Sequence, residues 1–239
     1  MRTGSSFSSL MAPCLLLLCA LAGCDTARSI SNSGFPDARG APNLAYRGEL
    51  SEFDLLGITA VEPITDAEIA TELAEAERVT PQIGKPILAV QSGALAPDAP
   101  MLSVLAESFP VAGFSGVPPQ DRAGFSRQLR LAAARGGIPQ ILCYWGVLET
   151  AKTNEATKLV SWVPIVGAIL PDQSQHMRIR LKAILMDVST GRWRMVSAEP
   201  AEDDSLSAAL NRRSSDQGQV EELKSEGYRR LARQLVALG

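Results

Sequence analysis

Three side chains of this sequence could carry out nucleophilic chemistry: Ser92, Cys143 and His176. A serine or cysteine nucleophile needs a base to take its proton, and His176 is the only histidine of the chain. Ser92 follows an apolar run and precedes Gly93, but a nucleophile elbow needs glycine two residues before the serine, where Val90 stands. Cys143 lies within an apolar run, where a thiol behaves as a small inert core residue. We therefore expect no catalytic residue and keep as the alternative a lipid-anchored hydrolase that uses Ser92 or Cys143 with His176.

The sequence predicts no metal, cofactor or nucleic-acid site. A zinc site would need mainly carboxylate ligands, because the chain has one histidine and we expect only Cys143 to remain as a free cysteine. We interpret the acidic cluster Glu199, Glu202, Asp203 and Asp204 as a solvated loop rather than a cation site. Neither standard spacing of a glycine-rich phosphate loop occurs. The formal net charge of −3 argues against a general nucleic-acid binder, which would present a basic surface.

The N-terminal stretch has the pattern of a signal peptide. Arg2 precedes an apolar run from Leu10 to Leu18, which is too short to span a bilayer as a helix. The following residues, Leu21-Ala22-Gly23-Cys24, resemble the lipobox of bacterial lipoproteins. The resemblance implies cleavage between Gly23 and Cys24 and attachment of acyl chains, such as palmitate, to Cys24. Two or three such chains anchor a protein stably in a membrane. An ordinary secretory signal with an incidental cysteine is the alternative.

This motif divides the chain into three segments. We expect residues 1–23 to be a signal peptide, 24–45 a lipidated flexible tether, and 46–239 a single α/β domain. Residues 25–45 are rich in Ser, Gly, Pro, Asn and Asp and show no apolar period, which is typical of a flexible tether. After cleavage and acylation, Cys143 is the only unmodified cysteine, so no intramolecular disulfide is expected. The domain is expected to face the periplasm of a bacterial cell envelope. The inner and the outer membrane are alternative locations for the anchor.

Apolar patterns in the sequence predict a set of strands. A short run over residues 86–90 indicates a strand buried on both faces. Longer strands are predicted over 138–150, over 157–170 with a bend at Pro164, and over 175–188. In the last of these, Met177, Ile179, Leu181, Ala183 and Leu185 alternate with Arg178, Arg180 and Lys182. The turn Ser189-Thr190-Gly191 then indicates a hairpin. The stretch 110–119 is interpreted as a Gly/Pro loop.

Four helices are also predicted. Thr65 and Glu68 form the pattern of a capping box for a helix that ends near Arg78 and buries Ile69, Leu73 and Ala76. Further helices are predicted after Asp98, after Asp121 as far as the glycine pair 136–137, and over 219–238. The order of elements predicts an α/β fold: a mixed β-sheet covered by helices, with a helical crossover, a C-terminal antiparallel hairpin and a closing helix.

Four stretches carry a second resemblance: ILAVQSG from residue 87, the glycine pair 136–137, ILCYWGVLE from residue 141, and MDVSTGRW from residue 186. In the last stretch, Asp187, Thr190 and Gly191 form an Asp-x-x-Thr-Gly turn. Together they resemble the compact α/β domain shared by the N-terminal domain of the translocation protein TolB, the curli-secretion lipoprotein and the lipoproteins that activate penicillin-binding proteins. The resemblance covers about residues 85–238. It carries no functional residue onto this chain, and the paired amphipathic transmembrane hairpins of the curli protein are missing.

Two features predict a surface for a partner. The nearly uncharged segment 159–171, which contains Trp162, fits a core strand, an oligomer contact or a hairpin on lipid. The basic row Arg178, Arg180 and Lys182 fits a solvated face or a docking patch. We expect a membrane-anchored, non-enzymatic module that binds or assembles with another envelope component, with Trp162 and the basic row as its partner-binding residues. A homo-oligomeric secretion component is a further alternative.

Overall fold

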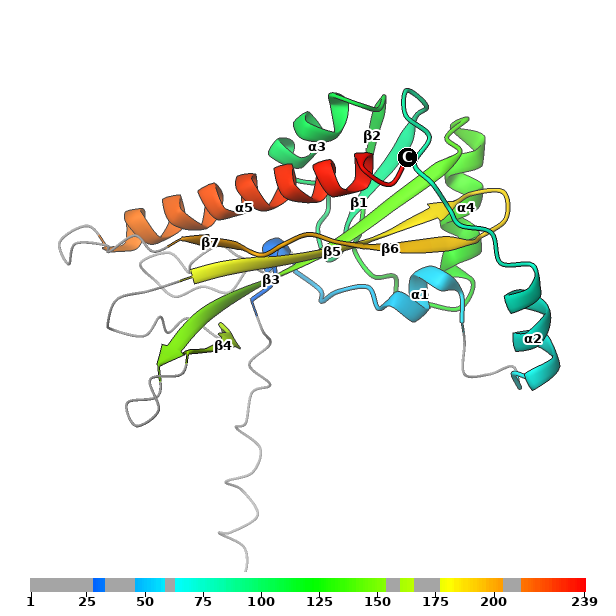
Figure 1. The fold of residues 1–239 in the computed structure, drawn as a ribbon, viewed down its shortest axis with the longest axis horizontal. Helices are drawn as coiled ribbons and strands as arrows, with labels where there is room; N and C mark the ends of the chain where they lie inside the picture. The colour runs from blue at the N-terminus through cyan, green and yellow to red at the C-terminus, as the bar shows by residue number, and fades with distance from the viewer. Residues whose placement is uncertain (1–27, 33–45, 59–62, 154–159, 166–176, 204–211) are drawn as a thin grey trace, which may run out of the picture.

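The computed structural model describes residues 28–32, 46–58, 63–153, 160–165, 177–203 and 212–239. Within these ranges the chain has an α/β fold, in which one mixed sheet of seven strands lies between two groups of helices (Figure 1). The predicted fold class is therefore confirmed. The predicted signal peptide, its predicted cleavage site, the predicted lipidation site Cys24 and the candidate base His176 lie outside the described residues.

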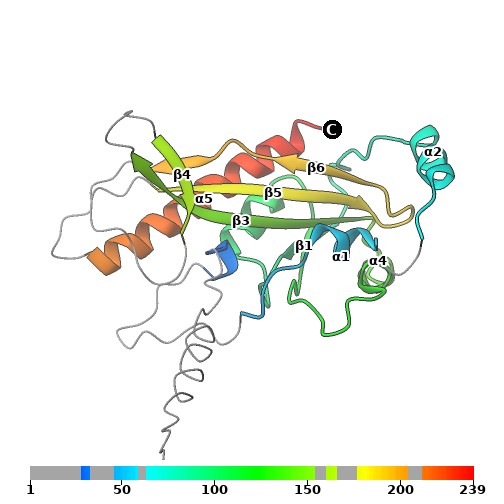
Figure 2. The ribbon, with the colours of Figure 1, turned by 90° about the horizontal axis from the view of Figure 1, so that it is seen from below.

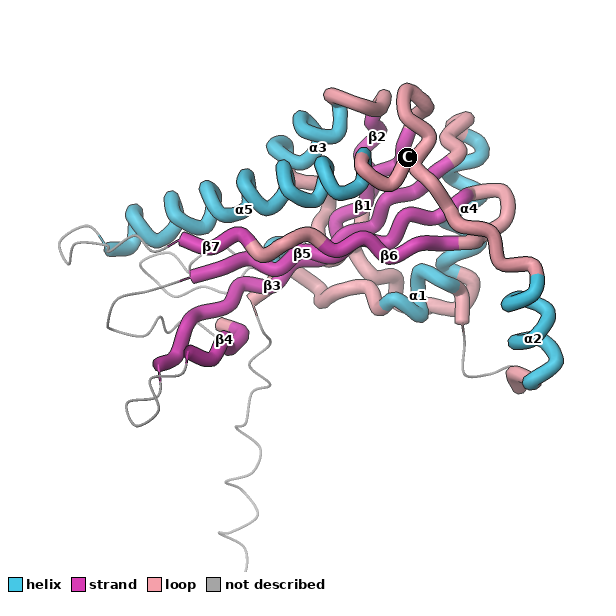
Figure 3. Tube along the Cα trace, in the orientation of Figure 1, coloured by secondary structure: helices cyan, strands magenta, loops and turns pink. Residues whose placement is uncertain are grey.

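The strand order is β2-β1-β3-β5-β6, with β4 paired to β3 and β7 paired to β5 (Figure 3). Strand β1 pairs in parallel with β2 and β3, whereas all other strand pairs are antiparallel. The described strands are β1 (Ile87–Gln91), β2 (Val111–Phe114), β3 (Gln140–Thr153), β4 (Val160–Pro164), β5 (Met177–Asp187), β6 (Trp193–Ser197) and β7 (Ala201–Asp203).

Helices cover both faces of the sheet. Helices α3 (Ala99–Ala106) and α5 (Arg212–Val236) lie over one face, and α1 (Glu52–Leu56) and α4 (Phe125–Arg135) lie against the other (Figures 1 and 2). The alternation in β5 sorts its side chains between these layers. Leu181 belongs to the core beneath α5, while Ile184 belongs to the core beneath α4. All five alternating residues predicted for the buried face of β5 are indeed buried.

Three local predictions were wrong, two of them because pairing at the sheet edge overrode weak local signals. The stretch predicted as a Gly/Pro loop contains β2, which extends the sheet beside β1. Helix α4 begins after Gly124 and not at Asp121, whose side chain instead accepts a hydrogen bond from Ala123 N at 2.9 Å. The acidic run expected to be a loop forms the short strand β7 over Ala201–Asp203. Asp204 lies outside the described residues.

Helix α2 (Asp66–Ala74) has the predicted start but not the predicted burial. Thr65 and Glu68 form the capping box, as expected. The helix ends at Ala74, however, and none of its residues is buried. It projects away from the sheet and the other helices in both views (Figures 1 and 2). The apolar spacing correctly indicated a helix, but spacing alone does not provide a surface for that face to pack on.

Part of the segment predicted as a flexible tether is packed into the fold. Ser29 forms an isolated antiparallel bridge with Val147 of β3, and Ile30 lies in the core beneath α5. Leu148 N donates to Arg28 O at 3.0 Å, and Arg28 N donates to Ile165 O at 2.7 Å. Residues 28–29 therefore pair with the edge of β3 between β1 and β4, and so protect backbone groups that an edge strand would otherwise leave open.

Candidate binding pocket on the sheet

The carboxyl end of β1 is closed by the chain itself. In α/β sheets, ligands commonly bind at the strand ends where successive crossovers pass to opposite faces. Here α3 packs on one face of the sheet and α4 on the other, so the carboxyl end of β1 is such a point. Ser92 lies at this point but is only 1% exposed. Its Oγ accepts a hydrogen bond from Leu50 N at 2.8 Å, and its carbonyl accepts one from Ser31 Oγ at 2.5 Å. In this conformation, Ser92 is a structural residue without access to a substrate.

A buried polar network continues from Ser92 toward α5. Gln91 Nε2 donates to Ser31 Oγ at 3.1 Å, and Gln91 Oε1 accepts from Tyr144 Oη at 2.9 Å and from Asp98 N at 2.8 Å. The Asp98 carboxylate in turn accepts from Tyr228 Oη at 2.6 Å. Because buried polar groups are costly when unpaired, these bonds hold β1, α3 and α5 in register.

This network predicts a loss of stability in alkaline solution. Burial, followed by neighbouring negative charge, raises the pKa of Tyr144 and Tyr228 well above the usual value near 10. Above about pH 10 the unfolded chain releases phenolic protons that the folded chain retains, so stability falls by about 1.4 kcal/mol per pH unit for each phenol. Urea unfolding between pH 8 and pH 11 should show this fall, with a shallower slope for Tyr228→Phe. Identical slopes for both proteins would contradict the assignment.

Cys143 is equally inaccessible. Its thiol is completely buried in the core beneath α4. Burial raises the pKa of the Cys143 thiol well above its ordinary range, and the charges of Glu49 and Glu52 raise it further. A protonated, enclosed thiol is a poor nucleophile.

We therefore expect iodoacetamide at pH 8 to leave Cys143 unmodified in the folded protein and to alkylate it fully in 6 M guanidinium chloride. Peptide mapping by mass spectrometry separates this thiol from the N-terminal cysteines. Rapid alkylation of Cys143 under native conditions, at the rate of a free thiol, would show that the core around it is open.

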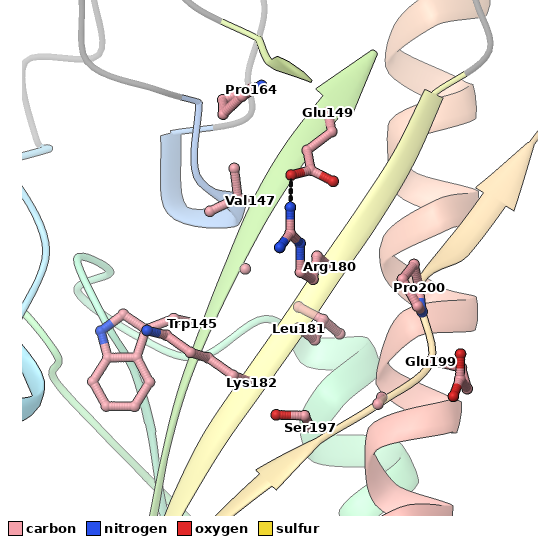
Figure 4. A pocket seen from close by; sticks show the side chains of 12 residues that line it. Trp145, Val147, Glu149, Pro164, Arg180, Leu181, Lys182, Ser197, Glu199 and Pro200 are labelled. Atoms are coloured by element: carbon pink, nitrogen blue, oxygen red, sulfur yellow. Dashed lines mark hydrogen bonds and ion pairs between the residues drawn. The ribbon is translucent and has the colours of Figure 1, made fainter. Parts of the chain in front are cut away.

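The sheet extends beyond α1 and α4 (Figure 2). An accessible pocket of about 550 Å³ lies on this part of the sheet (Figure 4). We call it the sheet pocket. Strands β3, β4, β5 and β6 and the segment that follows β6 contribute residues to it. Its twelve lining residues are Trp145, Gly146, Val147, Glu149, Pro164, Arg180, Leu181, Lys182, Ser197, Ala198, Glu199 and Pro200.

Glu149 organises the basic side of this pocket. Its side chain is only 2% exposed, and its two oxygens accept from Arg178 Nε at 2.6 Å and from Arg180 Nη2. Antiparallel pairing of β3 with β5 places Glu149 directly opposite Arg178 and brings Arg180 close along the same face. Arg178 is 16% exposed and Arg180 is 58% exposed. Arg180 is therefore the guanidinium that a bound molecule can reach (Figure 4).

Lys182 and Trp145 form the other side of the pocket. Lys182 Nζ pairs with Glu52 Oε1 and lies 5.7 Å from the centre of the Trp145 ring. The hydrogen bond from Lys182 lowers the pKa of Glu52, so this carboxylate stays charged at neutral pH. Trp145 Nε1 donates to Leu50 O at 2.7 Å, which fixes the plane of the indole. The ring is thus a rigid apolar wall beside a cation.

The predicted partner-binding residues are brought together, but not as free charges. Arg178 Cζ lies 4.2 Å from the centre of the Trp162 ring, which joins the basic row to β4. Each of Arg178, Arg180 and Lys182 has a carboxylate partner. The pocket therefore combines apolar walls with cations held in fixed positions. It can hold an apolar group that carries a hydrogen-bond acceptor at one end.

Glu149 and Trp145 were not among the residues predicted for the site. Their signal was nevertheless present, because Trp145, Val147 and Glu149 alternate along the predicted strand 138–150. This alternation places the three side chains on one face of the strand. Only the register of β3 with β5, however, brings that face beside Arg178, Arg180 and Lys182.

The described residues contain no group of three or more His, Cys, Asp or Glu side chains placed to hold a metal ion. Among the same residues, no helix combines the length and hydrophobicity that crossing a bilayer requires.

Comparison with known proteins identifies one family. The profile of the YafT bacterial lipoprotein family matches residues 51–238, which include the sheet pocket and all seven described strands. No curated protein and no solved structure gives a match. The resemblance to the TolB, curli-secretion and penicillin-binding-protein-activator group therefore stays a prediction.

Proposed function

The chain belongs to the YafT bacterial lipoprotein family, and from this membership we propose that acylated Cys24 anchors it to an envelope membrane, where its periplasmic domain binds another envelope component without catalysing a reaction. The family supports association with the cell envelope. The lipobox-like residues Leu21–Cys24 support the anchor.

The sheet pocket carries the binding part of the proposal. It is an accessible concave site of about 550 Å³, within the size range of sites for small ligands or side chains of a partner. Glu149 and Glu52 hold Arg180 and Lys182 in place before any ligand arrives, which lowers the entropy lost on binding. The favoured ligand is an apolar group of an envelope component with an acidic or carbonyl oxygen near it. Arg180 would donate to that oxygen while Trp145 packs on the apolar part.

Loss of the anchor is predicted to change the location of the protein. In cells, Cys24→Ser should leave the membrane fraction and lose incorporation of labelled palmitate, because no acyl chain can attach to the hydroxyl in place of the thiol. We expect at least a tenfold fall in the membrane-bound fraction, measured by fractionation and immunoblotting. Cys143→Ser is the control and should remain in the membrane fraction. An unchanged distribution of Cys24→Ser would refute the anchor.

Binding through the sheet pocket is tested by in-cell crosslinking of the tagged full chain and mass spectrometry of the captured species. The double variant Arg180→Ala/Lys182→Ala should capture at least fivefold less of a specific envelope component than the wild type. Both side chains are substantially exposed, so the fold should survive. Arg229→Ala/Arg233→Ala, at two exposed positions of α5, is the matched control for loss of two positive charges. Equal capture by all three proteins would remove the pocket from the proposal, and crosslinks only between copies of this chain would favour a homo-oligomer.

A further inference from the structure

Helix α2 presents apolar side chains that the fold does not use. Ile69 and Leu73 are 56% and 75% exposed, and Ile64, just before the helix, is 63% exposed. They recur at the spacing of one helix face. Every other α-helix of the described chain buries at least one apolar side chain in a core. A contiguous apolar surface that contributes nothing to the core commonly marks an interaction site.

This surface is concave. A groove of about 570 Å³ runs between α2 and the end of α1, and its shape offers room for side chains of another molecule. We call it the α2 groove. Its lining residues are Gly57, Ile58, Pro63, Ile64, Glu68, Ile69, Glu72, Leu73 and Ala76.

Charge around the groove selects the kind of molecule that can enter. Residues 63–77 carry five carboxylates and no lysine or arginine. Two of the five, Glu68 and Glu72, line the groove itself. A cationic apolar segment would pair with these carboxylates while burying its apolar side chains against Ile69 and Leu73. An anionic membrane surface would be repelled by the same charges.

We propose that the α2 groove is a second docking surface, which binds a cationic, apolar segment of another protein. The groove is distinct from the sheet pocket, since the two share no lining residue. A partner held at the α2 groove therefore does not depend on Arg180 or Lys182. The exposed position of α2 leaves it accessible while the domain is tethered beside a membrane (Figure 1).

The test is photo-crosslinking in living cells from the full chain. The photoreactive amino acid benzoylphenylalanine is placed at position 76, which lines the groove but leaves Ile69 and Leu73 intact. The same amino acid at position 131 is the control, because Leu131 is a 52% exposed apolar residue on a different helix. Crosslinked peptides are sequenced by mass spectrometry.

The expected product at position 76 is a peptide of another protein in which Lys or Arg residues stand among apolar ones. Its yield should fall at least fivefold with Ile69→Ser/Leu73→Ser and with Glu68→Gln/Glu72→Gln. Glutamine can still close the capping box with Thr65, so the second pair removes charge without removing the cap. Thermal unfolding monitored by circular dichroism should give the wild-type Tm for both pairs, because none of these side chains is buried.

The yield at position 76 should also be unchanged in Arg180→Ala/Lys182→Ala, which separates this proposal from binding at the sheet pocket. Adducts with lipid alone, adducts only with peptides of this chain, or a yield no greater than at position 131 would each overturn the proposal. A crosslinked partner whose yield does not respond to Glu68→Gln/Glu72→Gln would overturn it as well.

Discussion

Glu149→Gln is expected to lower the free energy of unfolding by about 3 kcal/mol, as is typical when one member of a buried ion pair is removed. The Glu149 carboxylate is almost completely buried and accepts from both Arg178 and Arg180. The Arg178 side chain is itself only 16% exposed, and its second carboxylate, Glu202, lies farther away at 3.6 Å and is 50% exposed, so neither Glu202 nor water replaces the lost charge fully. Glutamine has nearly the same volume, and the loss therefore reports the weakly compensated cation rather than a cavity. Urea unfolding at neutral pH measures it.

Two controls separate this charge effect from a general sensitivity of the site. Arg180→Gln removes the exposed partner and should cost less than about 1 kcal/mol, because exposed ion pairs contribute little. The double variant Glu149→Leu/Arg178→Met replaces both buried charges by apolar groups and should recover most of the stability lost in Glu149→Gln. A cost for Arg180→Gln equal to that for Glu149→Gln would contradict the assignment of Arg178 as the buried partner.

Gly116→Ala is expected to destabilise the fold by a similar amount, about 3 kcal/mol, the upper end of the range for overpacking. A Cβ at position 116 would lie 1.9 Å from Gln91 O and 2.6 Å from Gln91 C, which are backbone atoms that a side-chain rotation cannot move. The same close approach allows Gly93 N to donate to Gly116 O and Gly116 N to donate to Ala94 O, both at 2.9 Å. Alanine would separate these segments and disturb the network around Gln91.

Gly218→Ala is the matched control for this substitution. Nothing lies within 4 Å of a Cβ at position 218, which is part of α5. Alanine should therefore stabilise the protein by about 0.5 kcal/mol through its higher helix propensity. Denaturant unfolding of both variants measures the difference, and a wild-type stability for Gly116→Ala would show that the loop after β2 can move away from β1.

The elements of the central sheet were predictable because their signals are local. The buried run of β1, the alternation of β5 and the hairpin turn before β6 each follow from residue types at fixed spacing. The capping box of α2 was equally readable from Thr65 and Glu68. Strand β2 was missed because it is only four residues long and has no fully buried side chain. Such a strand forms where the edge of β1 is available to pair with it.

The candidate binding site was predictable only in part. Arg178, Arg180 and Lys182 were identified as a row on one strand face, and the structure does place them there. The partner of Arg178 and Arg180 is Glu149, which lies about thirty residues earlier in the sequence, on β3. No local pattern links residues at that separation, since the pairing is set by the register of two antiparallel strands. The basic row that was predicted as a solvated face or a docking patch is therefore a row of ion pairs.

The sequence by itself determined the fold class of this protein, the period of its main strands and helices, and, through residues 51–238, its membership of a lipoprotein family. Tertiary structure alone decided which apolar and polar surfaces of these elements are covered by other parts of the chain and which are exposed. Residues 28–32 close the crevice beside Ser92, whereas Ile69 and Leu73 of α2 find no surface to pack on. The physical reason is that helix and strand periods depend on near neighbours, while burial depends on contacts between residues that are distant along the chain.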